Sequence, residues 1–367
     1  MKKLILLVSF WALNGCNHAQ QSQPEKPIDS LKSAYGFVCS FSEGFAAVVL
    51  NGKCGYIDTT GEEIIPLKYG ETGDFSEGFA WVVLNGKFGF IDKKGKMVIP
   101  PKYDYTYNFS GGFAIVGLND KYGFINKTGK VVIPLKYNYA ADFSEGFARV
   151  VTDGYGFIDT TGKVVIPLKY DSANNFSEGF ASVKLNGKCG FIDTTGKIVI
   201  PLKYDNAGSF SEGFAYVKLN GKWGFIDKTG KEITPLKYYY PNDFSEGFAV
   251  VNLNGKYGFI DKTGKEVIPL KYDFAFDFNE GFAAVELNDK WGFINTAGKE
   301  IIPLKYERAD FFKEGLAAVE LNHKCGFIDT AGKVVIPLKY DNAGSFSEGF
   351  ACVELNDKWF IFEKQAK

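Results

Sequence analysis

Residues 176–209 read FSEGFASVKLNGKCGFIDTTGKIVIPLKYDNAGS, and the same wording begins again at Phe210. The opening sextet Phe-Ser-Glu-Gly-Phe-Ala, or a close variant of it, recurs ten times along the chain. Successive copies are 34 residues apart, except for one interval of 33; they begin at residues 41, 75, 109, 143, 176, 210, 244, 278, 312 and 346. A fixed period of this length indicates a repeat architecture, in which neighbouring units share one core.

Each unit has the pattern of three short β-strands. In the quoted unit an alternating stretch (180–185) leads into Asn186-Gly187, a pair that suits a two-residue hairpin because both central residues of a type I′ turn need a positive φ. The second stretch (188–193) ends in an aspartate that is expected to close an Asx turn, and a third stretch (198–204) follows. Pro201 in the third stretch cannot donate to a ladder, so we expect this strand at an outer or terminal position.

Three short strands present too little apolar surface to fold alone, so the units are expected to bury one another. We predict an all-β array of about ten 34-residue units over residues 31–367, with the last unit truncated after Phe362. Tyr35 stands six residues before Phe41, where other units place the tyrosine of the third strand. Such ends suit a closed β-propeller-like ring or a worn cap. Because 34 residues are few for a four-stranded blade, we favour an open or superhelical array, with the closed ring as the alternative.

The words Lys222-Trp223-Gly224-Phe225-Ile226-Asp227 and Lys290-Trp291-Gly292-Phe293 resemble the repeats of the WG-repeat family, also called KWG repeats. The resemblance covers about residues 33–363. It implies a mostly bacterial, often exported tandem β repeat, and it brings no catalytic residues with it. The tryptophan position accepts several apolar side chains, since other units fill it with Cys54, Phe88, Tyr122, Tyr155, Cys189, Tyr257 and Cys325.

The composition excludes several classes of function. Forty-two basic against 43 acidic residues leave a net charge of -1, which provides no field to gather nucleic acid, and a 46% apolar content is too high for a disordered chain. Only two histidines are present, His18 and His323, and His323 occupies a turn position. No nucleophile, base and orienting group recur at a suitable spacing. We therefore expect no enzyme activity, no metal site and no cofactor.

The N-terminal residues have the pattern of an export signal. Lys2 and Lys3 precede an apolar stretch (4–13) that is about half the roughly 20 residues a membrane-spanning helix needs. The following residues, 13–16, resemble the lipobox of bacterial lipoproteins, in which the cysteine, here Cys16, is lipidated. We expect residues 1–15 to be a signal peptide and residues 16–30 to hold the lipidated cysteine and a flexible Gln/Pro/Ser-rich tether. The predicted location is the cell envelope, periplasmic or surface-exposed, with a lipid anchor in the membrane.

The recurring cysteines are predicted to be core residues. Cys54, Cys189 and Cys325 share the tryptophan position, where a free cysteine packs as a small apolar side chain. Cys39 and Cys352 lie near opposite ends of the array, so a bridge between them would require a closed ring.

The recurring acidic and glycine positions are also predicted to be structural. Asn126 and Asn295 replace the aspartate that ends the second stretch in other units, and this exchange suits a turn better than a metal site or an acid catalyst. The sextet holds glycine at its fourth position in all ten units, from Gly44 to Gly349. An invariant position of this kind implies a positive φ or a close approach between neighbours.

A first candidate binding surface comes from the stretch Phe-Ala-x-Val-x-Leu, whose two x positions share one face. From the fifth unit onward the second x is polar, beginning with Lys184, so that face is expected to be exposed there. In the first four units the same positions are mostly apolar, which predicts an exposed strip that binds a partner. The alternative is local burial by the tether or a cap. The candidate strip is Val49, Trp81, Val83, Ile115 and Val151.

A second candidate surface lies in the five variable residues that precede each sextet. Exposed aromatic side chains there can stack on sugars or contact a peptide, whereas the alternative is that they fill gaps between units. The aromatic residues concerned are Tyr105, Tyr107, Tyr139, Tyr239, Tyr240, Phe274, Phe276 and Phe311.

The leading hypothesis is a non-enzymatic, lipid-anchored envelope protein whose repetitive surface binds another protein. The alternative is a carbohydrate-binding module for peptidoglycan or a surface glycan, which would use the aromatic residues. A hydrolase is the third and weakest hypothesis.

Overall fold

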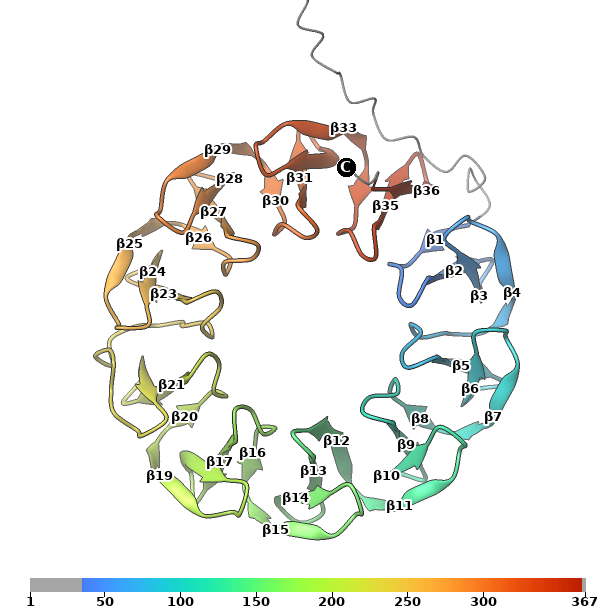
Figure 1. The fold of residues 1–367 in the computed structure, drawn as a ribbon, viewed down its shortest axis with the longest axis horizontal. Coiled ribbons are helices and arrows are strands. Elements are labelled where there is room, and N and C mark those ends of the chain that lie inside the picture. Colours follow the sequence, from blue (N-terminus) through green and yellow to red (C-terminus); the bar gives the residue numbers. More distant parts are fainter. Residues whose placement is uncertain (1–34, 365–367) are drawn as a thin grey trace, which may run out of the picture.

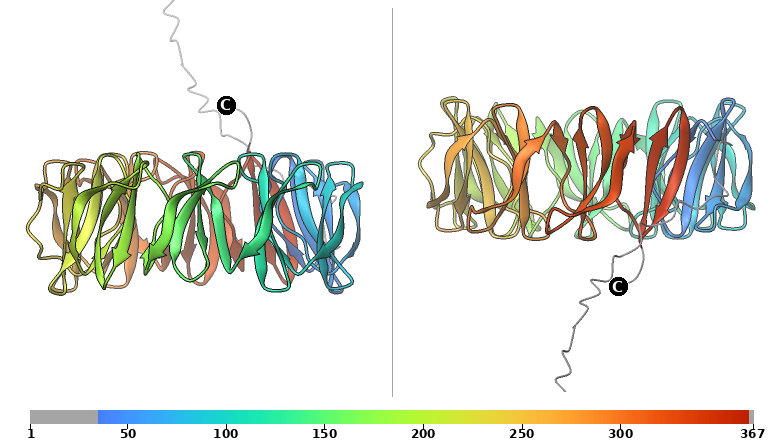
Figure 2. Two further views of the ribbon diagram at one scale, coloured as in Figure 1. Left: turned by 90° about the horizontal axis from the view of Figure 1, so that it is seen from below. Right: turned by 90° about the horizontal axis from the view of Figure 1, so that it is seen from above.

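The computed structural model describes residues 35–364, and these form a ring of ten antiparallel sheets, or blades, arranged like a β-propeller (Figure 1). The predicted signal peptide (1–15) and the predicted lipidated Cys16 with its tether (16–30), which includes His18, lie outside the described residues. Within residues 35–364 there is no helix, and so no helix that could cross a membrane. The all-β prediction is confirmed. Viewed from the side, the blades make a flat ring with turns along both rims (Figure 2).

Each blade is a meander that runs from the inside of the ring to the outside. Blade 1 consists of β1 (Phe37–Val38), β2 (Phe45–Leu50), β3 (Lys53–Asp58) and β4 (Glu63–Tyr69), paired in that order, and β4 lies on the outer wall (Figure 1). In the β2–β3 hairpin Phe45 faces Asp58 and Leu50 faces Lys53. Because successive strands are antiparallel, the β2–β3 turn lies on one face of the ring, and the β1–β2 and β3–β4 turns lie on the other.

The other blades repeat this plan. Blades 2 to 4 contain β5 (Phe79–Leu84), β6 (Lys87–Asp92), β7 (Met97–Tyr103); β8 (Tyr105–Thr106), β9 (Phe113–Leu118), β10 (Lys121–Asn126), β11 (Val131–Tyr137); and β12 (Tyr139–Ser144), β13 (Phe147–Val151), β14 (Tyr155–Asp159), β15 (Val164–Tyr170). Blades 5 to 7 contain β16 (Ser172–Ala173), β17 (Phe180–Leu185), β18 (Lys188–Asp193), β19 (Ile198–Tyr204); β20 (Asn206–Ala207), β21 (Phe214–Leu219), β22 (Lys222–Asp227); and β23 (Phe248–Leu253), β24 (Lys256–Asp261), β25 (Glu266–Tyr272). Blades 8 to 10 contain β26 (Phe274–Ala275), β27 (Phe282–Leu287), β28 (Lys290–Asn295), β29 (Glu300–Tyr306); β30 (Arg308–Ala309), β31 (Leu316–Leu321), β32 (Lys324–Asp329), β33 (Val334–Tyr340); and β34 (Asn342–Ala343), β35 (Phe350–Leu355), β36 (Lys358–Glu363).

The prediction of three strands per unit missed the innermost strand. In most blades this strand has two residues, such as Tyr105–Thr106, and it forms within the variable segment before each sextet. In blades 2 and 7 the same position is a single bridge, Thr72 to Val82 and Pro241 to Val251. Because the inner strand needs so few residues, a 34-residue unit is long enough for a four-stranded blade, and the reason for favouring an open array falls away.

The Glu-Gly and Asn-Gly pairs form the tight turns of each blade. Glu43 and Gly44 have φ values of 52° and 83°, and Asn51 and Gly52 have 51° and 71°, so both pairs hold the two positive φ angles of a type I′ turn. A Cβ added at Gly44 would meet no atom within 4 Å. The backbone conformation, rather than a close approach, is therefore what this glycine supplies.

The glycine that follows the tryptophan position, such as Gly190, is required for a different reason, which is the close approach of the outer strand. A Cβ at Gly190 would lie 2.5 Å from the carbonyl oxygen of Ile200 and 2.7 Å from that of Pro201. The β18–β19 pairing is bulged at this point, so the outer strand crosses close over the glycine. Pro201 lies in β19, the outermost strand of its blade, which confirms the outer-strand prediction.

The core lies between blades rather than within them. At the interface of blades 4 and 5, Phe176 packs with ring centroids 4.9 Å from Phe147 and 4.8 Å from Phe157. Phe157, Ile166 and Phe176 are almost fully buried together with residues of β17 and β18. Each sheet therefore has its two faces covered by two neighbours, as the expected mutual burial requires.

The ring is closed, so the open array that we favoured is wrong and the alternative is correct. Blades 10 and 1 share one core cluster, in which Trp359 is 8% exposed and its ring lies 5.1 Å from that of Phe37. Glu348 of blade 10 accepts hydrogen bonds of 2.7 Å from the backbone N–H groups of Glu43 and Gly44. The strands β1 and β36 lie side by side at this seam (Figure 1).

The glutamate of the sextet links each blade to the next. Glu43 accepts a 2.9 Å hydrogen bond from the N–H of Gly78 in blade 2, and Glu280 accepts two of 2.7 Å from the Glu314-Gly315 turn in blade 9. Two successive residues with positive φ direct their N–H groups outward as an anion-binding nest, which the carboxylate occupies. Blade 3 has Gly111 at this position, so it offers blade 4 no carboxylate.

Candidate functional site

The predicted apolar strip is not an exposed surface. Ile115 is 1% exposed and belongs to the core between blades 3 and 4, while Val49, Trp81, Val83 and Val151 are half-buried. The physical reason is the ring itself, since both faces of every blade pack against a neighbour. The same reasoning corrects the expectation that the polar positions of later units face solvent, because Asn252 is buried as well.

The aromatic residues before the sextets are at the surface. Tyr105, Tyr107, Tyr139, Tyr239, Phe274 and Phe311 are exposed, Tyr240 is the most exposed at 69%, and Phe276 is half-buried. Tyr105, Tyr139 and Phe274 are the first residues of inner strands, in which the first residue is exposed and the second is buried. The tyrosines among them gather in two groups, one on blades 2–4 and one between blades 6 and 7, and Phe274 and Phe276 form a third group with Trp291 of blade 8.

The first group, which we call the blade 2–4 cluster, is a chain of neighbouring rings. The ring of Tyr105 lies 6.0 Å from that of Phe88, 5.0 Å from that of Tyr107 and 6.2 Å from that of Tyr122. Tyr122 continues the chain to Tyr139, 6.4 Å away. The hydrogen bond to Tyr105 and partial burial raise the pKa of Tyr107, so the Tyr107 phenol stays neutral and serves as a hydrogen-bonding group.

Two side chains complete the blade 2–4 cluster. The guanidinium carbon of Arg149 lies 5.7 Å from the ring centroid of Tyr139 and 5.8 Å from that of Tyr155. At the other end Trp81 packs 5.4 Å from Phe88 and lies so close over Gly73 that a Cβ there would meet its indole nitrogen. The cluster therefore combines exposed tyrosines with an arginine and a half-buried tryptophan.

The second group surrounds a pocket of about 340 Å³ between blades 6 and 7. Tyr216 and Trp223 come from β21 and β22, and their rings are 5.4 Å apart. Tyr216 can lie there because position 208 is glycine, where a Cβ would fall 2.4 Å from the tyrosine ring. The main lining residues are Tyr216, Lys218, Trp223, Tyr239, Tyr240 and Pro241.

An irregular outer strand adjoins this pocket. Blade 6 has Thr234 where other units have a buried isoleucine, and Thr234 Oγ1 accepts a 2.9 Å hydrogen bond from the N–H of Phe225. Residues 232–239 form only isolated bridges instead of a strand. The Thr234 side chain thus takes the place of a backbone acceptor in the pairing with the neighbouring strand. The residues that follow this segment, Tyr239 and Tyr240, line the pocket.

Sequence reasoning named Tyr239 and Tyr240 but missed Tyr216, Lys218, Lys222 and Trp223. Two signals were available. Tyr239 stands where most units have Asp or Asn after Lys-Tyr, and Thr234 replaces the isoleucine that precedes the proline in the outer strand of other units. Both departures fall in the same unit, which marks it as different from the other nine.

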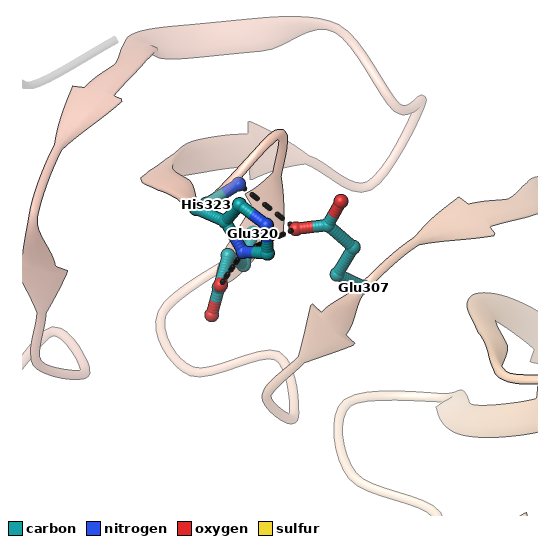
Figure 3. Close-up of side chains that lie close together, drawn as sticks. All are labelled: Glu307, Glu320 and His323. Carbon is teal, nitrogen blue, oxygen red and sulfur yellow. Dashed lines mark hydrogen bonds and ion pairs between the residues drawn. The ribbon is translucent and has the colours of Figure 1, made fainter.

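Within residues 35–364, Glu307, Glu320 and His323 form a group in which three possible metal ligands lie within 4.8 Å of one another (Figure 3). The His323 side chain is 91% exposed, as predicted for a turn residue. Glu307 accepts a 2.8 Å hydrogen bond from the His323 N–H, and this bond lowers the pKa of the Glu307 carboxyl. Asp104 and Asp205 accept equivalent bonds from the turns of their own blades, so turn stabilisation accounts for the group.

The cysteines described by the structure are all free thiols. Cys54 and Cys189 are buried, as predicted, and Cys325 is half-buried. At the seam the Cys352 thiol lies 3.4 Å from the backbone carbonyl oxygen of Cys39, whereas Cys39 packs toward the core shared by blades 1 and 2. Burial raises the pKa of Cys352 to about 12 and that of Cys39 to about 11, so neither is a reactive thiolate.

Comparison with known proteins identifies one family. The model described as "WG containing repeat" matches ten consecutive segments, which are residues 34–54, 55–88, 88–122, 122–154, 155–189, 190–223, 223–257, 257–291, 291–325 and 326–359. A search of curated proteins gives no match.

Solved structures with a similar shape are distant. The crystal structure of the eukaryotic initiation factor has 12% identity and a TM-score of 0.47, over 82% of this chain and 86% of that chain. BamB from Moraxella catarrhalis has 13% identity and a TM-score of 0.34, over 84% and 94%. With identities and TM-scores this low, no function transfers from these proteins.

Proposed function

The chain belongs to the WG containing repeat family, and from this premise we propose that it is a non-enzymatic, lipid-anchored binding scaffold of the cell envelope. The blade 2–4 cluster is its protein-binding surface. The N-terminal residues 13–16, with Cys16 as the lipidated residue, support the anchor. The repeated blade plan supports a scaffold, because ten units present a long surface of similar geometry.

The observation that supports protein binding is the composition of the blade 2–4 cluster. Tyrosine, tryptophan and arginine are the residue types enriched at the energetic centres of protein interfaces. Here Tyr105, Tyr107 and Tyr139 are exposed side chains, and Arg149 and Trp81 flank them. Rigid aromatic side chains of this kind lose little conformational entropy on binding.

Affinity capture from an envelope extract tests this proposal. We expect the wild-type protein to retain one or more specific proteins, and the double variant Tyr105→Ser/Tyr139→Ser to lose at least about tenfold in affinity, as interface hot spots do. Val164→Ser/Ile198→Ser is the matched control, because these exposed side chains lie on the outer strands β15 and β19. Equal capture by both variants, with unchanged melting temperatures, would refute the cluster as the binding surface.

A second candidate function is glycan binding, and the pocket between blades 6 and 7 favours it. Its walls are aromatic and its volume, about 340 Å³, lies within the range of small-molecule sites. The two functions therefore use different blades and can be tested separately.

A further inference from the structure

In four blades the lysine at the start of the third strand forms an ion pair with an aspartate. Lys188 lies 2.7 Å from Asp205, and Lys256 and Lys324 form the same contact with Asp273 and Asp341. In each case the aspartate is the residue that follows Lys-Tyr in the chain. Each pair neutralises the positive charge of its lysine.

Blade 6 lacks this ion pair beside its aromatic pocket. The residue after Lys237-Tyr238 is Tyr239, so the position that holds the carboxylate elsewhere holds a phenol ring here. Lys222 Nζ lies 3.4 Å from the centroid of this ring, and Lys218 Nζ lies 5.3 Å from that of Trp223. A cation over an aromatic face keeps its full charge. None of the described residues that line the pocket is acidic.

The pocket thus joins aromatic faces to the ammonium group of Lys218, and the ammonium group of Lys222 lies over the ring of Tyr239, one of the lining residues. Aromatic side chains with a polar edge suit a ligand that has both apolar C–H surface and hydroxyl groups. A lysine ammonium is a mobile point charge that can approach an anionic oxygen from several directions. A pyranose ring that carries a carboxylate has all of these features, whereas a neutral sugar would leave the two lysines unused.

We propose that the pocket between blades 6 and 7 binds a carboxylate-bearing sugar, which packs on Trp223 and Tyr240 and places its carboxylate at Lys222 and Lys218. This inference rests on the glycan-binding candidate and is independent of the blade 2–4 cluster. Blade 8 offers an internal contrast. Its aromatic group has Glu286 at the position of Lys218, and Phe276 already stacks on Trp291 with centroids 5.3 Å apart.

Isothermal titration with defined sugars tests the proposal on the full-length protein. The probes are an oligosaccharide of glucuronic acid, the matched oligosaccharide of glucose and a muramic acid disaccharide. We expect both acidic probes to bind, and at least one to bind about tenfold tighter than the glucose probe, a difference of about 1.4 kcal/mol. The two acidic probes distinguish a uronic acid polymer from peptidoglycan as the source of the ligand.

Three variants make the test specific. Tyr239→Asp restores the acidic partner of Lys222 and is expected to reduce the preference for acidic over neutral probes to about twofold or less, since the paired lysine is neutralised. Tyr240→Ala removes the most exposed ring and should weaken both probes together. Lys256→Gln, which removes a lysine already paired with Asp273, is the control and should change neither affinity.

Several results would overturn the proposal. Equal affinity of the wild type for acidic and neutral probes removes the role of the lysines. Unchanged binding in Tyr240→Ala places the ligand elsewhere. Absence of binding by any probe refutes the sugar site, as does tighter binding of an acidic peptide than of either acidic sugar. Because Tyr105→Ser/Tyr139→Ser leaves this pocket intact, loss of protein capture and loss of sugar binding are distinguishable.

Discussion

The aspartate that ends the third strand of a blade shows how one side chain can fix a turn. Asp261 Oδ1 accepts hydrogen bonds of 2.8 and 3.1 Å from the N–H groups of Thr263 and Lys265, and one of 2.6 Å from the Thr263 hydroxyl. Asn126 makes the equivalent contacts through its amide oxygen. The prediction that the Asp and Asn at this position are turn residues is thereby confirmed.

Substitution of Asp261 separates the geometry from the charge. We expect Asp261→Asn to change the free energy of unfolding at pH 7 by less than about 0.5 kcal/mol, because the amide oxygen accepts the same bonds. Asp261→Ala removes the acceptor and should cost about 1 kcal/mol, a value reduced by exposure to solvent. Urea unfolding of the three proteins measures both effects. An asparagine variant as unstable as the alanine variant would show that the negative charge itself is required.

The same pair of proteins predicts a pH dependence. The hydrogen bond from the Thr263 side chain, and further bonds from the backbone, lower the pKa of Asp261 below the unfolded value of 3.8. A lowered pKa gives stability that is present above the unfolded pKa and is lost as the pH falls through the folded pKa. The stability difference between wild type and Asp261→Asn should therefore be constant near neutral pH and should shift against the wild type below about pH 4.

The comparison with Asp261→Asn matters because other carboxyls act in the opposite direction. Burial raises the pKa of Asp74, Asp142 and Asp277, so their contribution is lost as the pH rises. Taking the difference between the two proteins cancels these groups. A difference that stays flat down to pH 3 would contradict the prediction for Asp261.

Most of a blade can be predicted from the sequence, because three of its strands follow from alternation and from the Asn-Gly and Asp-x-Thr-Gly turns. The inner strand could not, since its two residues vary from Tyr105-Thr106 to Arg308-Ala309 and carry no hydrophobic period. The retrospective signal is a small residue at its second position, such as Ala173, Ala207 or Ala309, which is buried against the preceding blade. The prediction of an exposed apolar strip was wrong because the sequence of one unit does not show that both faces of its sheet pack against neighbouring blades.

The contact between blades 3 and 4 lacks the glutamate found at the other contacts, because Gly111 stands at this position. A substitution of Gly111 can therefore stabilise the ring. Nine units hold a glutamate at this turn position with φ between 51° and 55°, and Gly111 has a similar φ of 60°. We expect Gly111→Glu to place a carboxylate at the blade 4 turn and to raise the free energy of unfolding by about 0.5–1 kcal/mol. The midpoint of urea unfolding is the measurement.

The neighbouring glycine is the matched control for this substitution. Gly112 has a φ of 83°, and every unit holds glycine at this place, so Gly112→Glu should lower stability by about 1 kcal/mol or more. If Gly111→Glu lowers the free energy of unfolding to the same degree, the hydrogen bond to the carboxylate contributes less than the cost of a positive φ at a residue with a side chain.

For the whole molecule, the core shared by blades 10 and 1 determines whether the first and last strands are as stable as the other strands. In an open array the last strand would fray, and removal of Trp359 would matter little. In a closed ring Trp359→Ala opens a cavity in the core shared by blades 10 and 1, and it should cost about 3–5 kcal/mol. Urea unfolding and amide hydrogen exchange of β1 and β36 are the measurements. Exchange of these strands much faster than that of β17 and β18 in the wild type would contradict closure.

The repeat count, three of the four strands of a blade and the turn chemistry could be predicted from the sequence, whereas closure of the ring could not. The ends at Tyr35 and Phe362 fit a ring and a cap equally well, because the contacts that distinguish them join residues more than 300 positions apart, such as Glu43 and Glu348. The pocket between blades 6 and 7 was missed for a related reason. Its walls come from two units, and neither unit shows it alone.

Every glutamate link joins a blade to the one that follows it, never to the one before, and this common direction has a geometric consequence. The molecule has no two-fold axis in the plane of its blades, so its two sides are chemically different objects. A flat support such as a bilayer or a glycan sheet meets one side or the other. The side of the ring that faces the support therefore determines whether Lys222 and the aromatic rings beside it are accessible to a ligand.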